Sequence, residues 1–272
     1  MSGAAPEPGP AYETANIHLN VSGEERAFPV AVPLGERPLL DLLPAARELT
    51  DQATAAAVDQ ARAQGRAVSC RAGCAACCRE LVAISLAEAQ DLADLVAALP
   101  PERQAAVRAR FAEALRRLEA SGLLDPGEVP GERALHAAAG SSRLAAACEV
   151  AQRYFAEQIP CPFLENESCS IYPQRPMVCR EYHVTSPAER CARLYEVSVD
   201  RLRGPIQMTG VLARTAHRAA GVPVQTFPLV LALEWADAQG SALARAQDGL
   251  GLFRALIGEI DPGYDEVDAA QD

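Results

Sequence analysis

A short run of cysteines limits what this chain can fold into more than any other feature. Four cysteines fall within the nine residues 70–78, with the spacing C-x3-C-x2-C-C. A segment this short can turn several sulfurs toward one point, and Gly73 permits the positive φ that such a turn often needs. Two adjacent cysteines do not easily serve one tetrahedral centre. Either one of the pair points elsewhere, or the site holds more than one metal atom. The four are Cys70, Cys74, Cys77 and Cys78.

A second set of cysteines begins about 80 residues after the first. Together the two sets contain eight of the nine cysteines. The ninth, Cys148, stands alone in an alanine-rich helical pattern and is typical of a buried small hydrophobe. Neither set alone is a closed, regular ligand set, so we expect the two to meet in space around a metal ion or an iron–sulfur cluster. The second set is Cys161, Cys169, Cys179 and Cys191.

Structural thiols and disulfides are the two alternatives to a metal site. Purely structural thiols would be fewer and scattered. A disulfide framework is typical of small secreted domains, whereas a chain of 272 residues can bury a hydrophobic core. Residues 1–15 have neither the basic nor the apolar region of a secretory signal. We therefore expect reduced thiols and a cytoplasmic protein.

The two cysteine blocks resemble the YkgJ-type cysteine-cluster proteins, also described as zinc- or iron-chelating domains. The resemblance covers residues 70–84 and 161–182, under a sixth of the chain. Flagellin lysine N-methylases share the cysteine pattern and are thought to carry an iron–sulfur cluster. The resemblance thus implies a metal or cluster site and leaves the activity open. Its later motifs are Cys161-Pro162-Phe163-Leu164, Cys169-Ser170-Ile171-Tyr172, Arg175-Pro176 and Cys179-Arg180-Glu181-Tyr182.

All eight clustered cysteines are candidate metal ligands, with His183 as an additional one. Zinc prefers pairs with C-x2-4-C spacing, whereas iron–sulfur clusters accept irregular spacings, and thiolates are soft enough for both. We expect an iron–sulfur cluster or iron, with zinc as the alternative. Four thiolates leave such a centre with a charge of about −2, and burying that charge requires compensation. Arg71, Arg180 and Tyr182 are the residues expected to contact the cofactor, while Glu181 is a further candidate to line the site.

The composition excludes several classes of function. A net charge of −11 argues against a nucleic-acid partner, and no apolar run of 18 residues exists to span a membrane. Because all 25 basic residues are arginine, no lysine can form a Schiff base or bind phosphate in a P-loop. Catalysis stays open. The alternatives to a metal-binding protein are a cluster-dependent enzyme acting on a protein or peptide, and a structural-zinc interaction module.

The helix-favouring composition and hydrophobic periodicity predict a mainly α-helical protein with a small N-terminal β-hairpin. Residues 1–15 are expected to form a disordered leader, 16–262 a metal-binding helical domain with an irregular cysteine-lined site, and 263–272 an acidic tail. Alternating apolar residues predict strands over 17–21 and 26–32. The predicted helices span 38–64, 85–99, 102–120, 132–157, 205–220 and 228–259, and Gly122–Gly131 is expected to be a loop.

The segment Ile159–Val184 is predicted to lack long helices and strands. Prolines at 160, 162, 173 and 176 interrupt the backbone hydrogen bonds of both helices and β-strands. Metal ligation would supply the ordering that secondary structure cannot, since structural zinc in small peptides contributes about 10–16 kcal/mol. After it, Ser186-Pro187-Ala188-Glu189 predicts a helix with a serine cap and Cys191 one turn inside.

Overall fold

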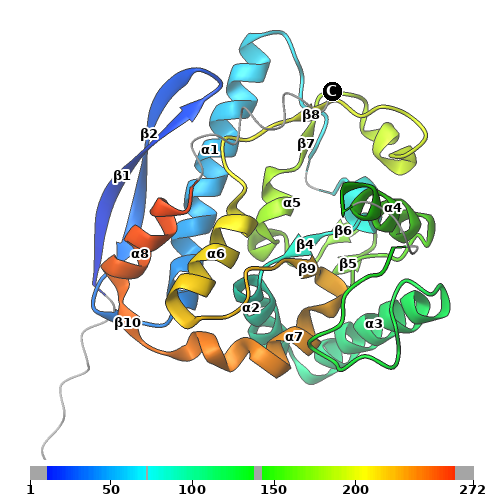
Figure 1. Cartoon of the computed structure of the whole chain (residues 1–272). Helices are drawn as coiled ribbons and strands as arrows, with labels where there is room; N and C mark the ends of the chain where they lie inside the picture. Colours follow the sequence, from blue (N-terminus) through cyan, green and yellow to red (C-terminus); the bar gives the residue numbers. More distant parts are fainter. Residues whose placement is uncertain (1–10, 72, 138–142, 261–272) are drawn as a thin grey trace, which may run out of the picture.

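The structure, a computed structural model, describes residues 11–71, 73–137 and 143–260. Helices dominate these ranges, as predicted, and the strands within them form only two-stranded antiparallel pairs. Figure 1 shows the N-terminal hairpin and α1 along one side of the molecule and α3 and α4 on the other, with α5 between them. Buried apolar side chains from the hairpin to α8 form one continuous hydrophobic cluster.

The predicted hairpin consists of β1 (Tyr12–Val21) and β2 (Glu24–Pro33). Alternate residues of both strands are buried, and this face packs on α1 (Leu43–Ala63). The strand begins earlier than predicted, because Tyr12 pairs with Pro33. The prediction of a leader is therefore wrong for residues 12–15: backbone pairing extends the strand past the point where apolar alternation ends. Residues 1–10 and the predicted acidic tail lie outside the described residues.

The helices before the second cysteine set largely follow the predicted boundaries. η1 (Leu39–Leu42) leads into α1, and α3 spans Pro101–Ala120. α2 (Leu86–Ala97) begins at the predicted capping box, in which Ser85 accepts the Glu88 N–H and Glu88 accepts the Ser85 N–H. This reciprocal pairing satisfies backbone donors that a helix start leaves free.

The helix predicted over 132–157 is shorter, since α4 spans only Arg143–Ala156. Residues 133–137 are not helical. Arg133 is buried there and forms ion pairs with Glu119 and Glu234. These long-range pairs fix the backbone in a non-helical path. Residues 138–142 lie outside the described residues.

The helix predicted from Ser186 is instead a six-residue 3-10 helix, η4 (Ala188–Arg193). The Ser186 hydroxyl does not cap it. That oxygen accepts the Asp200 N–H at 3.2 Å, so a distant loop takes the hydrogen bond that the capping prediction assigned to η4.

The C-terminal helices close the core around α2. α6 (Met208–Ala220) and α7 (Ala232–Gln239) both pack on α2. The region predicted as helix over 228–259 is divided into several short elements, and β10 pairs with β3 (Glu36–Arg37). None of the described helices is long and apolar enough to cross a membrane. The remaining C-terminal elements are η5 (Leu229–Leu231), η6 (Gly240–Ala244), β10 (Gln247–Asp248) and α8 (Gly249–Gly258).

Short elements hold the two cysteine segments. Near the first lie η2 (Ala76–Arg79) and β4 (Ala83–Ile84), which pairs with β9 (Phe227–Pro228). As predicted, the segment from 159 to 184 contains only short elements. They are β5 (Leu164–Glu165), β6 (Ser168–Cys169), η3 (Tyr172–Gln174), α5 (Met177–Glu181) and β7 (His183–Val184), which pairs with β8 (Arg201–Leu202).

Candidate metal centre

The two cysteine sets, separated by about 80 residues, line one cavity. Its volume is about 120 Å³, several times the space that one water molecule needs. All eight clustered cysteines and His183 contribute to its lining, together with Arg71 and Tyr182. The sulfur-bearing segments therefore meet in space, although the described residues between them include the helices α2, α3 and α4. Apolar side chains, Val82, Phe163 and Leu229 among them, also line the cavity.

The first segment is fixed at Cys70 against β7. The Ser69 N–H donates to the Val184 carbonyl at 3.0 Å, and the Val184 N–H donates to the Cys70 Sγ at 3.3 Å. This places Cys70 next to the strand that carries His183. Gly73 has φ +81°, a conformation that L side chains rarely adopt. The turn then leads into η2, which carries the adjacent Cys77 and Cys78.

The second segment is attached directly to the first. The Cys161 N–H donates to the Cys78 carbonyl at 2.8 Å. A tight hairpin follows, in which Leu164 pairs with Cys169 and the Leu164 N–H donates to the Cys161 carbonyl at 2.8 Å. The hairpin therefore brings Cys161 and Cys169 together. At its tip, Glu167 forms a two-point ion pair with Arg79 of η2, at 2.7 and 3.1 Å.

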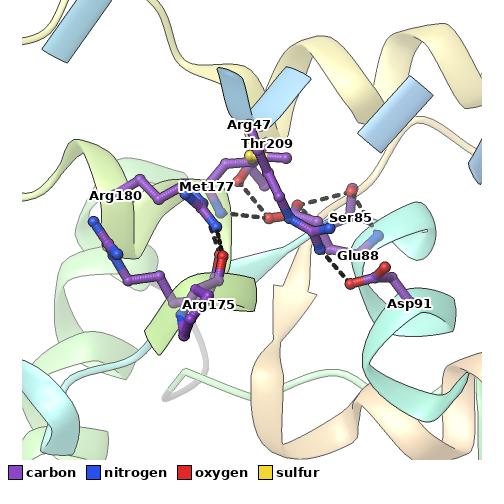
Figure 2. Close-up of polar contacts among 9 residues, drawn as sticks. Arg47, Ser85, Glu88, Asp91, Arg175, Met177, Arg180 and Thr209 are labelled. Atoms are coloured by element: carbon purple, nitrogen blue, oxygen red, sulfur yellow. Dashed lines mark hydrogen bonds and ion pairs between the residues drawn. The ribbon is translucent and has the colours of Figure 1, made fainter. Parts of the chain in front are cut away.

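A buried carboxylate positions the helix that carries Cys179. Glu88 is 2% exposed, and Figure 2 shows it between α2, α5 and α6. It accepts hydrogen bonds from the Ser85 N–H (2.9 Å) and hydroxyl (2.8 Å), from the Met177 N–H (2.8 Å) and from the Thr209 hydroxyl (3.3 Å). Met177 is the first residue of α5. The capping box thus does more than begin α2: it also fixes the start of the Cys179 helix.

Arg180, which the sequence analysis expects to contact the cofactor, does not line the cavity. Its side chain is buried and donates to the carbonyls of Arg175 (3.0 Å) and Pro173 and to the Asp51 carboxylate (2.6 Å). A buried guanidinium needs such acceptors, and here they lie away from the sulfurs. Figure 2 shows the bond from Arg180 to Arg175. Arg180 therefore shapes the 173–180 segment.

Arg175 lines the cavity in place of Arg180. Its guanidinium lies 3.9 Å from the centre of the Tyr172 ring, which also lines the cavity. Its Nη1 donates to the Tyr172 carbonyl at 3.0 Å. The Arg-Pro-x-x-Cys motif was the available signal for Arg175, although sequence alone does not separate its role from that of Arg180. Glu181 also differs from expectation: it is outside the lining and accepts the Met208 N–H at 2.8 Å.

Burial dominates the electrostatics of the thiols. It raises the pKa of Cys161 to about 12 and that of Cys191 to about 11, and it raises the pKa of Cys179 well above the ordinary value. The pKa of Cys77 is raised first by its hydrogen bond with Cys78. Burial lowers the pKa of His183, so its imidazole is neutral and able to ligate a metal at neutral pH. A metal would have to displace protons from these thiols.

The donor set suits a thiophilic metal. No Asp or Glu lies among the described lining residues, so the cavity offers sulfur and imidazole but no carboxylate oxygen. Such donors suit zinc, iron or an iron–sulfur cluster rather than magnesium or calcium. Across the described residues, no three His, Cys, Asp or Glu side chains already form a metal-holding group. The fit therefore lies in the donors and their shared cavity, and ligation would draw the sulfurs together.

The fold and site define a helical protein with a thiol-lined cavity built from two distant cysteine segments. Residues 69–198, which contain all the described lining residues of this cavity except Leu229, match the family model CxxCxxCC, described as "putative zinc- or iron-chelating domain". This match agrees with the resemblance that the cysteine motifs show. No curated protein and no solved structure matches the chain. The first motif has one residue more than the family name spells between its first two cysteines, Cys70 and Cys74.

All nine cysteines are free thiols. Cys148 lies outside the cavity and is exposed on α4, whereas its sequence context predicts an apolar, buried position. The alanine-rich pattern around it does not show which face of the helix is covered. Its separation from the other eight makes Cys148 a useful control for experiments on the cavity.

Proposed function

We propose that the domain at residues 69–198 binds an iron–sulfur cluster or iron through cysteine thiolates, with zinc as the alternative metal. The observation that carries this proposal is the single cavity lined by all eight clustered cysteines and by His183. Scattered structural thiols have no reason to gather in this way. The irregular cysteine spacing favours a cluster over the regular pairs typical of zinc.

The residues around the cavity have distinct roles in this proposal. The thiols of the two segments would ligate the metal as thiolates, and His183 supplies a neutral nitrogen donor. Arg71 and Arg175 would offset the charge of the thiolates, because both line the cavity. An iron–sulfur cluster would supply electron-transfer or Lewis-acid chemistry. The chain's own part is to hold the sulfurs and limit the access of water.

Zinc remains the alternative metal because the contacts between the two cysteine segments suit a structural metal site. Cys161 is hydrogen-bonded to Cys78, and Glu167 is paired with Arg79, so a metal shared by both segments would tie together elements that already touch. Structural zinc commonly makes such a tie. In this case the domain would support interactions with other proteins rather than redox chemistry.

Metal analysis of protein purified without oxygen tests the proposal. Iron with acid-labile sulfide and visible absorption would identify a cluster, iron without sulfide a mononuclear site, and zinc without colour the alternative. Cys179→Ser should lose most of the bound metal, because that thiol lines the cavity on the α5 side. Cys148→Ser should keep the wild-type content. A folded wild-type protein without metal, or equal metal content in both variants, would contradict the proposal.

A further inference from the structure

The cavity contains more donors than one metal centre uses. A single tetrahedral zinc site or a single [4Fe–4S] cluster takes four protein ligands. Eight thiols and one imidazole line the cavity, which leaves several donors unused by any one such centre. Packing alone does not explain why so many thiols line one cavity. Other small hydrophobic side chains would fill the same space without the risk of oxidation.

The adjacent cysteines of η2 are the sharpest sign of this surplus. Consecutive side chains on a 3-10 helix point about 120° apart, because the helix has three residues per turn. Even so, Cys77 and Cys78 both line the cavity. Neither cysteine is outside the cavity lining. The pair is therefore better explained by two metal positions than by one metal with the other cysteine serving a separate purpose.

The other six cysteines are carried by two groups of elements that both contact η2. In one group, Cys70 is bonded to β7, and η4, which carries Cys191, packs on η2. In the other group, the β5–β6 hairpin joins Cys161 to Cys169, and the Cys161 N–H binds the Cys78 carbonyl. Different structural elements therefore build the two groups, and η2 contacts both.

Hydrogen bonds assign the remaining two cysteines. The Cys74 N–H donates to the Arg71 carbonyl at 3.0 Å, within the turn that begins at Cys70. The Nε of Arg175, which follows Cys169 by six residues, donates to the Cys179 carbonyl at 3.4 Å.

We propose that the cavity holds two metal centres, one beside Cys70, Cys74 and Cys191 and one beside Cys161, Cys169 and Cys179. The η2 pair, Cys77 and Cys78, gives a thiolate to each centre. Eight cysteines then complete two sets of four, and His183 lies on the Cys70 side through β7. This inference rests on the proposed function, since it concerns how the same thiols are shared out.

Cobalt titration of the full-length, metal-free chain under anaerobic conditions tests the division. Co²⁺ alone is the probe, and thiolate-to-cobalt absorption is the readout. Wild type should saturate at about two equivalents, because each tetrahedral centre uses four ligands. The double variants C70S/C74S and C161S/C169S should each saturate at about one equivalent, whereas C148S should match wild type. Circular dichroism identifies any variant that fails to fold, and native mass spectrometry of zinc-loaded wild type counts the ions without using a variant.

The outcomes separate the two proposals. Saturation of wild type at one equivalent, with one zinc ion by mass spectrometry, would overturn the two-centre division and leave the metal-binding function standing. Loss of all cobalt binding in either double variant would also overturn the division, provided that the variant folds. No binding of cobalt or zinc to wild type, together with a metal-free protein as purified, would overturn both.

Discussion

At the scale of single residues, Glu88 is a carboxyl group held in the described core by hydrogen bonds. It is fully buried without a cationic partner, and four hydrogen-bond donors from three segments surround it. Burial raises its pKa, while the bonds from Ser85, Met177 and Thr209 oppose that shift. The net direction is upward, so the folded chain keeps a proton on Glu88 at pH values where the unfolded chain has released it.

This shift predicts a pH dependence of stability. Between the ordinary pKa of 4.5 and the raised value in the folded protein, the folded state binds more protons than the unfolded state. The free energy of unfolding therefore falls as pH rises through this window. Glu88→Gln does not titrate, so the wild-type free energy of unfolding minus that of the variant should decrease from pH 4.5 upward. Urea unfolding at a series of pH values measures the difference; a flat or increasing difference would show that the four donors outweigh burial.

The two arginines of the Arg-Pro-x-x-Cys-Arg motif should respond differently to substitution. Arg180→Lys should lower the free energy of unfolding by about 1–3 kcal/mol, because lysine cannot reach all three acceptors. Arg175→Gln should cost about 1 kcal/mol or less, the size of an exposed stacking contact, but should weaken metal binding because its charge faces the thiols. Denaturant unfolding and metal titration of both variants check the contrast. Equal effects on metal binding would contradict it.

At the scale of elements, α3 supports the second cysteine segment through one aromatic contact. Phe111 of α3 meets Phe163 edge-on, with ring centres 5.6 Å apart, and Phe163 lies two residues after Cys161. Phe111→Ala should lower the free energy of unfolding by about 3–5 kcal/mol through the cavity that it leaves. Arg116→Ala on the exposed face of the same helix should change it by about 0.5 kcal/mol or less. Similar losses in the two variants, measured by urea unfolding, would show that this contact does not stabilise the packing of α3 on the second cysteine segment.

Capping motifs and hydrophobic periodicity correctly predicted the elements whose stabilising hydrogen bonds lie within the element itself. The capping box of α2 and the amphipathic pattern of α3 are local, and both helices formed as expected. Elements fixed by distant partners were mispredicted. Ser186 bonds to Asp200 instead of capping η4, and Arg133 pairs with Glu234 about 100 residues away. A hydrophobic or capping pattern contains no information about such partners.

The candidate site shows the same limit. The meeting of the two cysteine sets was predictable, because shared chemistry gives distant thiols a reason to gather. The roles of Arg175 and Arg180 were not, since the two lie close together in the sequence and both are near cysteines. The acceptors that hold Arg180 away from the cavity include Asp51 of α1, a residue more than 100 positions earlier in the chain.

At the scale of the whole molecule, the matched domain depends on elements outside it. The helices α2 and α5 lie within residues 69–198, but they pack on helices outside that range. α2 packs on α6 and α7, and α5 packs on α1. Glu88 also needs the Thr209 hydroxyl. A fragment of residues 69–198 should therefore lack cooperative unfolding in the absence of metal and bind hydrophobic dyes, whereas the full chain should unfold cooperatively. Circular dichroism melts and dye fluorescence compare the two. A fragment that melts as sharply as the full chain would contradict this dependence.

The distance along the chain between the two cysteine sets has an entropic consequence. A metal shared by Cys78 and Cys161 acts as a cross-link that closes a loop of about 80 residues. In the chain-entropy treatment of cross-links, a loop of that size contributes about 4–5 kcal/mol by restricting the unfolded ensemble. A centre built from one cysteine set alone closes no such loop and contributes none of this. In the two-centre arrangement both centres act in this way: the η2 thiolate joined to Cys161 closes a loop of about 80 residues, and Cys191 joined to Cys70 closes one of about 120 residues.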